Sequence, residues 1–410
     1  MTISTRTPLS IAVVLGLLSS TQATAAGFQL AEYSATGLGR AYAGEAAMAD
    51  NASAQWRNPA MLTYLEGTQI SGGVLYVEPN IDVKGTAGNT YTEAKDIAHS
   101  APVPNLYVSH QINDKYFAGL ALSSNYGMET ELDKGFTATQ YGNQAKVMTV
   151  EAVANIGYKI NDQFSLGGGV RFVTGEGHFG ATVPGTTTNL KYMEGTDSSW
   201  GYVLGGAWQI NDSNRIGFAY KSEVMMDFDG HGEGMGFELE LPGFTGKQPG
   251  KLSIALPATA EIASFHQLTP KWAMHTSINW TQWSSFDKLT AEFDNGQVSD
   301  IKEENWKDNF RFALGTTYSL NKKLSLRAGA AYDMSAVDDK NRTTTIPETD
   351  RTWLSAGASY AFTSQFTLDG GLTYIMARTA PIKESGTLYP FEGEMSGDVW
   401  IAGIQANYRF

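Results

Sequence analysis

Apolar and polar residues alternate along most of the chain from about residue 68 onward. The alternation is clearest in the last stretch, Gly397–Phe410. One face of that stretch carries Trp400, Ala402, Ile404, Ala406, Tyr408 and Phe410, and the other carries Ile401, Gly403, Gln405, Asn407 and Arg409. A period of two predicts a β-strand, and an apolar face opposite a polar one is typical of a strand between lipid and a polar lumen.

Short polar turns interrupt this alternation at intervals of 42 to 58 residues. The six turns are Ile112–Lys115, Ile160–Gln163, Ile210–Ser213, Leu268–Lys271, Leu320–Lys323 and Phe362–Gln365. Two strands and one longer Gly- or Asp-rich loop separate successive turns, which is the asymmetry of outer-membrane barrels. A soluble solenoid could repeat near this period, but its units should resemble one another more closely.

Six turns join twelve strands, and one strand at each end predicts fourteen. The first of these lies near Thr68–Val77 and the last is Gly397–Phe410. Because a large barrel encloses more space than its own side chains fill, its lumen must either conduct water or be closed by another segment. We therefore predict an all-β, fourteen-stranded antiparallel transmembrane barrel.

One segment before the barrel, Gly27–Leu62, lacks the alternation. It is rich in Ala and Gly, contains the helix-like piece Ala41–Met48 and ends in the turn tripeptide Asn58, Pro59 and Ala60. We expect it to form a small helical plug in the lumen. The predicted division is a signal peptide over residues 1–25, a plug over 26–66 and the barrel over 67–410.

The first 25 residues have the order of a secretory signal. Arg6 is a basic start, Ile11–Leu18 an apolar core and Ala23–Ala25 a small-residue cleavage site. The apolar core is too short to span a bilayer as a helix, which needs about 20 residues. Since no later stretch has 18 consecutive apolar residues, a membrane-spanning form of this chain has to be a closed barrel.

Composition is compatible with this fold but does not prove it. The chain has 44 Gly, 9 Trp, 19 Tyr and 19 Phe, as expected for Gly-rich turns and the aromatic girdles of an outer-membrane barrel. A soluble β-sandwich remains an alternative on composition alone. The absence of Cys suits export without a disulfide scaffold, and 42 acidic against 29 basic residues argue against a nucleic-acid partner.

Enzyme chemistry has little support in the sequence. The histidines show neither a metal-ligand pair at helical spacing nor a neighbouring Gly-x-Ser-x-Gly motif; they are His99, His110, His178, His231, His266 and His275. Gly37-Leu38-Gly39 lacks the βαβ context of a nucleotide site. Some outer-membrane lipases and proteases use scattered Ser, His and Asp, which sequence leaves open. We expect no cofactor, no metal and no enzymatic activity.

The N-terminal segment identifies a family resemblance. Ala26–Ala60, which reads AGFQLAEYSATGLGRAYAGEAAMADNA followed by RNPA, closely resembles the plug of the FadL family of long-chain fatty-acid transporters. Weaker echoes cover the rest of the chain, at Gly119–Gly127, Tyr220–Asp229, Arg311–Tyr318 and Asn341–Gly357. The terminal Phe410, with Tyr408 before it, also resembles the assembly signal that the barrel-assembly machinery reads in bacterial outer-membrane proteins.

The resemblance implies a monomer in the outer membrane of a Gram-negative bacterium. Family members move long-chain fatty acids passively: extracellular loops capture the ligand, the lumen binds it, and it leaves sideways into the membrane through a kink in the third strand. The alternative is uptake of small hydrophobic compounds such as monoaromatic hydrocarbons, which relatives on this fold perform. An open aqueous porin is a further class.

The resemblance places the lateral exit in the third strand, expected from Tyr116 to about Tyr126. The kink is expected at Ser124, Asn125, Tyr126 and Gly127, and Gly within a strand often marks a bulge. The alternative is that Gly127 only begins the next loop. Phe28 is implied to reach the lumenal ligand, and its alternative role is packing against the barrel wall.

A carboxylate headgroup in an apolar lumen needs a cation, because an unpaired buried charge is costly. Lys302 aligns with a family lysine that approaches the headgroup, whereas the position of its partner arginine reads Ala181. Arg171 and His178 lie on the same predicted strand and are candidate substitutes. Lys302 could instead be a solvated charge beside two glutamates. The loop Ala181–Ser198 is shorter than in the family and puts the outer capture groove in doubt.

The loop Gly230–Gly250 carries apolar residues among Gly and Glu, namely Met235, Phe237, Leu239, Leu241 and Phe244. Exposed apolar patches usually bind something, which makes Phe237, Leu239 and Phe244 candidate ligand contacts. A self-packed loop is the alternative. Pro257, in the strand that follows, is expected at a bulge.

Overall fold

The structure, a computed structural model, describes residues 27–386 and 389–410. The predicted signal peptide lies outside the described residues. The described chain forms a closed antiparallel β-barrel of fourteen strands, as predicted, and strands β1 (Thr68–Ala87) and β21 (Phe391–Arg409) pair along their lengths to close the ring. None of the described helices is long and apolar enough to cross a membrane.

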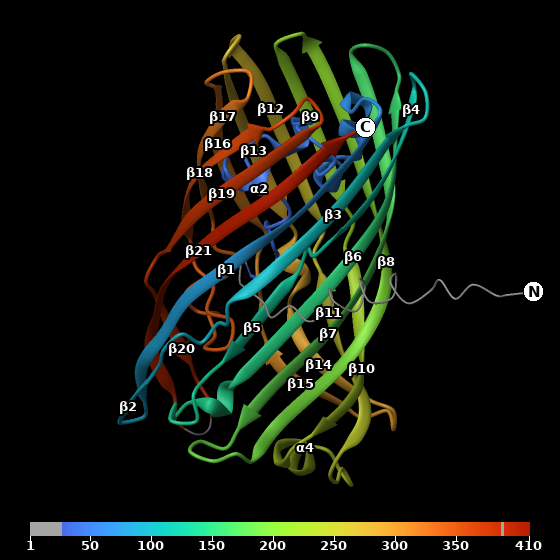
Figure 1. Cartoon of the computed structure of the whole chain (residues 1–410). Coiled ribbons are helices and arrows are strands. Elements are labelled where there is room, and N and C mark those ends of the chain that lie inside the picture. Colours follow the sequence, from blue (N-terminus) through green and yellow to red (C-terminus); the bar gives the residue numbers. More distant parts are fainter. Residues whose placement is uncertain (1–26, 387–388) are drawn as a thin grey trace, which may run out of the picture.

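Several of the fourteen barrel strands are interrupted and consist of two consecutive segments. Each segment has its own label, so the labels run to β21 (Figure 1). The first half contains β2 (Thr90–Ala94), β3 (Ala101–Gln111), β4 (Tyr116–Ser123), β5 (Gly127–Glu131), β6 (Gln144–Lys159), β7 (Phe164–Thr182), β8 (Asn189–Asn211), β9 (Asn214–Lys221) and β10 (Val224–Glu233). The second half contains β11 (Gln248–Leu256), β12 (Thr259–Thr269), β13 (Trp272–Thr281), β14 (Lys288–Phe293), β15 (Val298–Glu303), β16 (Asn309–Ser319), β17 (Leu324–Asp333), β18 (Arg351–Ala361), β19 (Phe366–Ala377) and β20 (Ala380–Glu384).

The six short turns lie together at one end of the barrel, at the top of Figure 1, beside the C-terminus. The longer loops lie at the opposite end, with the short helices η3 (Thr139–Tyr141) and α4 (Met235–Glu240). Short turns face the periplasm and long loops the exterior in outer-membrane barrels. The two ends are therefore called the periplasmic and the extracellular end.

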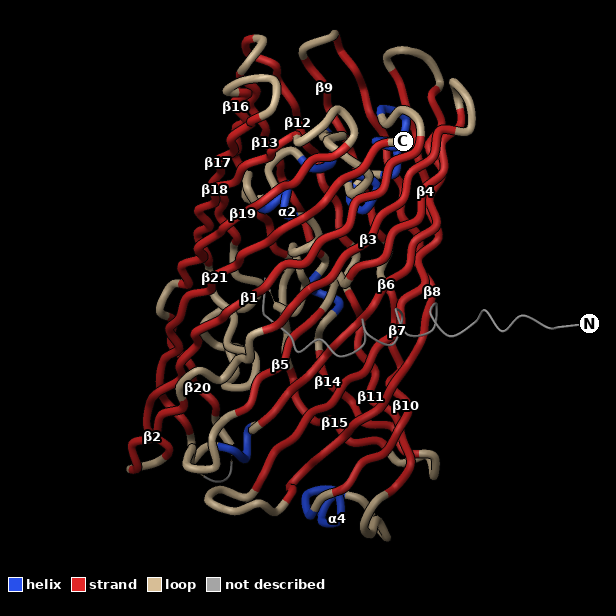
Figure 2. Tube along the Cα trace, in the orientation of Figure 1, coloured by secondary structure: helices blue, strands red, loops and turns tan. Residues whose placement is uncertain are grey.

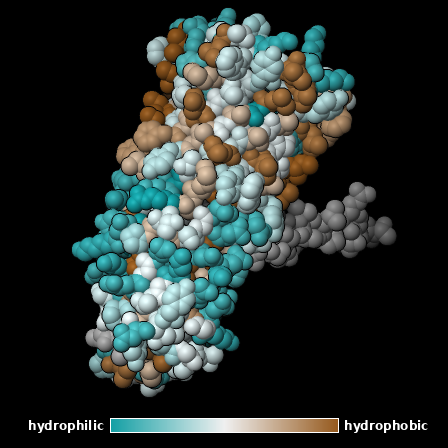
Figure 3. Space-filling model, turned by 90° about the vertical axis from the view of Figure 1, so that its left-hand side faces the viewer, coloured by the Kyte–Doolittle hydropathy of each residue, from teal (hydrophilic) through white to brown (hydrophobic). Residues whose placement is uncertain are grey.

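On the face shown in Figure 3, apolar side chains gather in the periplasmic part of the outer wall, and hydrophilic ones cover most of the rest. The face of β21 predicted to meet lipid is exposed, with Trp400, Ile404 and Tyr408 on it, whereas Ile401 and Gln405 are buried inside. Farther along the paired strands β21 and β1, the outward residues become polar, and Asn80 bonds Asp398. The barrel thus extends well beyond an apolar belt on its extracellular side.

The plug occupies the periplasmic part of the lumen, where Figure 2 shows loops and short helices inside the ring of strands. Its helical pieces are α2 (Ala35–Leu38), η1 (Glu45–Ala47), α3 (Ala54–Arg57) and η2 (Pro59–Tyr64). The expected helical piece over Ala41–Met48 is wrong in its extent, because only Glu45–Ala47 of it is helical. Ala41 and Tyr42 have positive φ, and the backbone turns there because the Tyr42 N–H donates to the Gly37 carbonyl.

Candidate functional site

The third barrel strand is broken. It consists of β4 and β5, and residues 124–126 between them belong to neither. Along the neighbouring β6, Ser123 pairs with Glu151 and Gly127 with Met148, so three residues of the third strand face two of β6. The break coincides with the expected kink, and Gly127 begins a new strand segment rather than a loop.

The break carries the chain into the lumen. The hydroxyl of Tyr126 donates to the carbonyl of Pro257 at 2.6 Å, and Pro257 lies in a gap between β11 and β12 on another part of the wall. On the other side, β3 pairs with β4 only from Leu106 onward. In the described chain, residues 101–105 of β3 therefore have no third-strand partner. The ladder between the second and third strands is interrupted from the break to the bridge between Ala98 and Thr130.

The N-terminal segment lies along this inward break. Gln29 and Tyr126 form an isolated antiparallel bridge, the Leu30 N–H donates to the Asn125 carbonyl, and the Gly127 N–H donates to the Phe28 carbonyl, both at 2.8 Å. Sequence reasoning did not find this pairing. The three residues have no strand-like alternation that would have predicted it.

Phe28 lies in a cage of aromatic rings. Its ring centroid is 4.7 Å from that of Trp283 and 5.2 Å from that of Phe286, both in edge-to-face geometry, and Tyr126 and Trp306 complete the cage. Trp283 belongs to η4 (Trp283–Ser285), in the gap between β13 and β14, and Trp306 follows β15. The tryptophans stand where the strand alternation stops, which is the one signal in the sequence that could have found them.

An apolar cluster continues from this cage toward the extracellular end. It contains Met128 of the third strand, wall residues such as Val173, Met226 and Ile254, and Phe293 near the loops. Phe237 of α4 and Phe244 after it are buried in the same cluster, with ring centroids 5.1 and 4.8 Å from that of Phe293. Leu239, on the other side of α4, is 80% exposed. We call this set the lumen cluster.

Phe237 and Phe244 are therefore packed inside the loop, as the self-packed alternative has it, and Leu239 is the candidate that faces outward. The stretch Ala181–Ser198, expected to be a loop, consists largely of strand. Strands β7 and β8 run past the other strands and pair up to Thr182 and Asn189, which leaves residues 183–188 to connect them. Ala181 is buried in the lumen cluster.

Lys302 is already paired. Its ammonium lies 2.8 Å from Glu384 Oε1 of β20 and donates to the Tyr141 carbonyl and to Thr345 Oγ1. It is thus neither solvated nor an unpaired cation facing the lumen cluster. Glu304, two residues on, is buried and accepts a bond from Trp306 Nε1, and burial raises the pKa of Glu304 to about 7.

Arg171 is also occupied. Its guanidinium binds both carboxylate oxygens of Glu151 at 2.8 Å and donates to the Ser222 carbonyl, and Lys221 lies 3.7 Å from the same carboxylate. His178 is seven residues farther along β7, and side chains alternate along a strand. It lies on the outer face beside Tyr192, so it cannot substitute for a lumenal arginine, which corrects that expectation.

The plug is fixed to the wall through its Asn58-Pro59-Ala60 motif. Asn58 accepts from the Ala60 N–H and donates to the carbonyls of Ala46 and Gly206. Gly167 and Gly205 face the motif, and a side chain at either would collide with Pro59, Ala60 or Asn58. Glycines in the wall thus let the plug backbone approach the strands closely.

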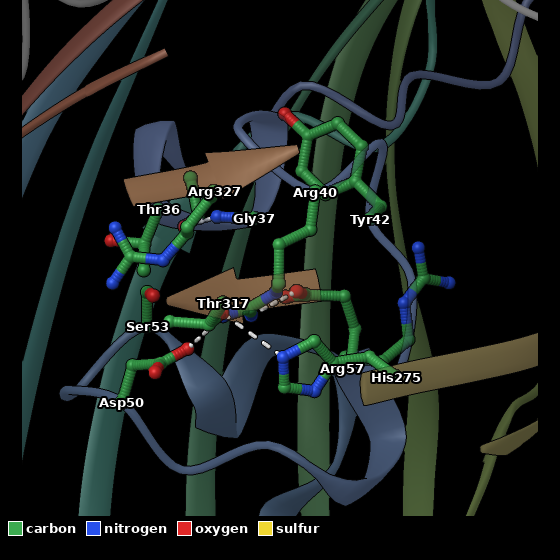
Figure 4. Close-up of polar contacts among 12 residues, drawn as sticks. Thr36, Gly37, Arg40, Tyr42, Asp50, Ser53, Arg57, His275, Thr317 and Arg327 are labelled. Carbon is green, nitrogen blue, oxygen red and sulfur yellow. Dashed lines mark hydrogen bonds and ion pairs between the residues drawn. The ribbon is translucent and has the colours of Figure 1, made fainter. Parts of the chain in front are cut away.

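Ion pairs within the plug stabilise its fold on the periplasmic side (Figure 4). Arg40 lies 2.6 Å from Glu45 and 2.7 Å from Asp50, and burial would raise the pKa of Asp50, but Arg40 and Arg327 lower it to about 2. Two polar cavities of about 290 and 420 Å³ lie on the periplasmic side of these residues. The periplasmic mouth is therefore open to water up to the plug.

Cavities beside the break are much smaller. One of about 30 Å³ is lined by Gly27, Met128 and Ile346, and another of about 40 Å³ by Gln29, Leu30 and Arg311. Pockets for drug-sized ligands have about 300–1,000 Å³, so the structure shows the pathway closed. Throughout the described residues, no group of three or more His, Cys, Asp and Glu is placed to hold a metal ion.

Proteins of known family are similar to this chain over nearly its whole length. A family model described as "Outer membrane protein transport protein (OMPP1/FadL/TodX)" covers residues 16–410. A long-chain fatty acid transport protein of Escherichia coli O6:H1 is 35% identical over 447 residues, with 100% of this chain and 99% of that protein covered. A 47 kDa outer membrane protein of Pasteurella multocida is 37% identical over 428 residues, covering 98% and 97%.

Two solved structures show the same fold. A Pseudomonas aeruginosa FadL homologue has a TM-score of 0.86 at 22% identity and covers 94% of this chain and 100% of its own. The Pseudomonas putida toluene transporter TodX has a TM-score of 0.68 at 17% identity and covers the same shares.

Proposed function

Because the chain belongs to the FadL and TodX family of outer-membrane transport proteins, we propose that it carries long-chain fatty acids or similar amphiphiles inward by diffusion. The observation that carries this proposal is the lumen cluster, which runs from α4 at the extracellular end to the broken third strand. Such a cluster gives an alkyl chain apolar surroundings along its whole course.

The way straight through the barrel is blocked by charge. Glu151, paired with Arg171 and Lys221, lies at the level where β4 and β9 break, since it pairs with Ser123, the last residue of β4. Arg57 of the plug adds a further ion pair in the lumen, 3.2 Å from Glu261. An alkyl chain gains nothing from burial among ion pairs, so we propose that the ligand leaves sideways where the ladder between β3 and β5 is interrupted.

The N-terminal segment has to move for this route to open. It covers the break from inside, and the cavities around it are too small for a ligand. Phe28, at the inner end of the lumen cluster, is our candidate for the residue that an arriving ligand displaces. Leu239 is the candidate for capture, and Lys302 borders the cluster through Ile301.

A second candidate substrate is a small uncharged compound such as a monoaromatic hydrocarbon. The observation in its favour is that Lys302 and Arg171, the expected headgroup partners, are both neutralised by carboxylates. TodX of Pseudomonas putida, which has the same fold, is a toluene transporter. We also propose that the protein is monomeric and that Phe410, which is exposed at the barrel end, is recognised by the assembly machinery.

Uptake of labelled oleate and labelled toluene tests the proposal. The host is a Gram-negative strain that lacks its own fatty-acid porter, with the protein or with empty vector. Oleate uptake above the vector supports the fatty-acid function, and toluene uptake alone transfers the protein to the second candidate. Uptake of neither contradicts both, and a large steady conductance in planar bilayers would instead indicate an open porin.

A further inference from the structure

Arg311 is an interior cation that forms no ion pair with any described carboxylate. It lies on β16, donates through Nη2 to the Ala41 carbonyl at 2.8 Å and sits 4.7 Å from the ring centroid of Trp353. Among the described residues no carboxylate lies within 4 Å of its guanidinium, and its Nε has no hydrogen-bond partner. The other arginines within the barrel mostly contact carboxylates, as do Arg40, Arg57, Arg171, Arg327 and Arg351.

Arg311 lines the cavity of about 40 Å³ that lies behind the N-terminal segment. Gln29, Leu30 and Ala31 line this cavity together with Arg311 and Trp353. Two further charged residues line it and are paired elsewhere: Arg57 lies 3.2 Å from Glu261, and Asp333 lies 3.4 Å from Arg351. The indole Nε1 of Trp353 is a second buried donor with no partner in the described chain. Since one buried water needs about 10–15 Å³, the cavity has room for a group of about three heavy atoms.

Two unpartnered donors, one of them charged, favour an anion in this cavity. A buried donor without a partner destabilises the protein, and the cost is larger when the donor is charged. A carboxylate offers two acceptor oxygens to the fork of a guanidinium. An alkyl chain does not fit the volume and would leave both donors unsatisfied.

The cavity borders the proposed ligand pathway. Gln29 follows Phe28, whose aromatic cage ends the lumen cluster, and the amide oxygen of Gln29 accepts from Thr281 Oγ1 at 3.0 Å, two residues before Trp283. The N-terminal segment is thus the partition between the lumen cluster and Arg311. Its movement would join the two spaces.

We infer that the cavity at Arg311 and Trp353 is a carboxylate subsite, which takes the headgroup of an amphiphile when the N-terminal segment leaves the broken strand. This inference deepens the proposed function and rests on it for the identity of the ligand. A headgroup bound there favours the displaced state of the segment, because the closed state does not offer it this contact.

Two carboxylates within the chain are rival partners for Arg311. Asp333 lines the same cavity but lies 3.4 Å from Arg351. The other is Glu32. It follows Ala31, is buried, and neither of its carboxylate oxygens has a hydrogen-bond partner among the described residues. If the role of Arg311 were to hold Glu32, removal of either charge would have the same effect. The same holds for Asp333, so the Glu32→Gln and Asp333→Asn variants separate internal pairing from headgroup binding.

The test is equilibrium dialysis of labelled octanoate and labelled octan-1-ol against the purified full-length protein in detergent. Arg311→Gln is expected to weaken octanoate binding about tenfold, the loss of a charged hydrogen bond, and to leave octanol within about twofold. Arg311→Lys, which keeps the charge, is expected to lie between Arg311→Gln and the wild type. Arg215→Gln is the matched control, since Arg215 also lacks a carboxylate partner in the described chain but stacks on Tyr64 at the periplasmic cavity.

Equal loss of octanoate and octanol binding in Arg311→Gln would overturn the subsite, and so would a Glu32→Gln or Asp333→Asn variant that reproduces its profile. Absence of octanoate binding by the wild-type protein would overturn it as well. Uptake of oleate in cells is measured separately. A wild-type protein that binds octanoate through Arg311 but takes up no oleate supports the subsite and contradicts the proposed function.

Discussion

Gln29 and Tyr126 are partners in an isolated antiparallel bridge that joins the N-terminal segment to the broken third strand. The flanking bonds run from Leu30 to Asn125 and from Gly127 to Phe28. The third strand lacks its β3 partner at this level, so the N-terminal segment supplies the hydrogen bonds that its exposed edge would otherwise leave unmade. One segment therefore covers the interrupted ladder and ends the lumen cluster.

Deleting Asn125 should abolish uptake. The deletion leaves two third-strand residues facing two of β6. β4 and β5 can then join into one regular strand that pairs with β6, and the inward break is lost. We expect oleate uptake to fall to the vector level while the barrel still shows heat-modifiable migration on gels. Asn125→Ala, which keeps the residue count, serves as the control. Full uptake by the deletion variant would remove the lateral route.

Lys302→Ala and Glu384→Gln should have the same effect. Each leaves the partner charge unpaired and largely buried, which typically costs about 3–5 kcal/mol, and the loops at Tyr141 and Thr345 lose their common anchor. We expect both variants to be cleaved faster in the extracellular loops by added protease. If Lys302→Ala weakens octanoate binding while Glu384→Gln changes nothing, Lys302 contacts the headgroup instead.

Leu239 and Phe244 should separate capture from stability. Leu239 is exposed on α4, so Leu239→Ser should lower oleate uptake a few-fold at low ligand concentration and leave protease resistance unchanged. Phe244 is buried against Phe237 and Phe293, so Phe244→Ala should destabilise the loop by about 3–5 kcal/mol. Equal uptake curves for Leu239→Ser and wild type would exclude α4 from capture.

Attachment of the N-terminal segment should weaken as pH rises. Burial raises the pKa of Glu32 from 4.5 to about 7, with Arg351 and Arg311 acting against it. Glu32 binds its proton more tightly when the segment is attached than when it is detached. Protonation of Glu32 therefore stabilises the attached state fully below about pH 4.5, and this stabilisation is lost as pH rises through about 7. Hydrogen exchange of the Leu30 amide, corrected for its intrinsic rate, should lose at most about tenfold protection per pH unit. Glu32→Gln should remove this slope, and an unchanged slope would assign it to another group.

Much of the fold could be predicted because its causes are local. Alternation with a period of two and turns such as Asn161-Asp162 locate strands and their ends without knowledge of the rest of the chain. The interior could not be predicted in the same way. The positive φ of Ala41 and Tyr42 depends on the close fit of the plug to the barrel wall, and Lys302 meets Glu384 only once the barrel has closed.

The same limit applies to the candidate site. The break at Ser124–Tyr126 was located through the family resemblance, but its partner, the N-terminal segment, is distant in sequence and shows no strand pattern. The expectation that His178 substitutes for the family arginine rests on the strand it shares with Arg171, whereas alternation counted from Arg171 places His178 on the outer face. Arg311 could not be distinguished from the other arginines until the carboxylate partners of those residues were visible.

Locking the N-terminal segment onto the break tests the central claim most directly. The bonds flanking Gln29 and Tyr126 make them a non-hydrogen-bonded antiparallel pair, whose Cα atoms lie about 4.5 Å apart, within disulfide reach. The chain has no Cys, so a Gln29→Cys, Tyr126→Cys double variant forms a single cross-link. Oleate uptake should fall to the vector level when this variant is oxidised and recover when it is reduced, and each single variant should respond to neither treatment. Uptake that persists in the fully cross-linked protein would contradict the account.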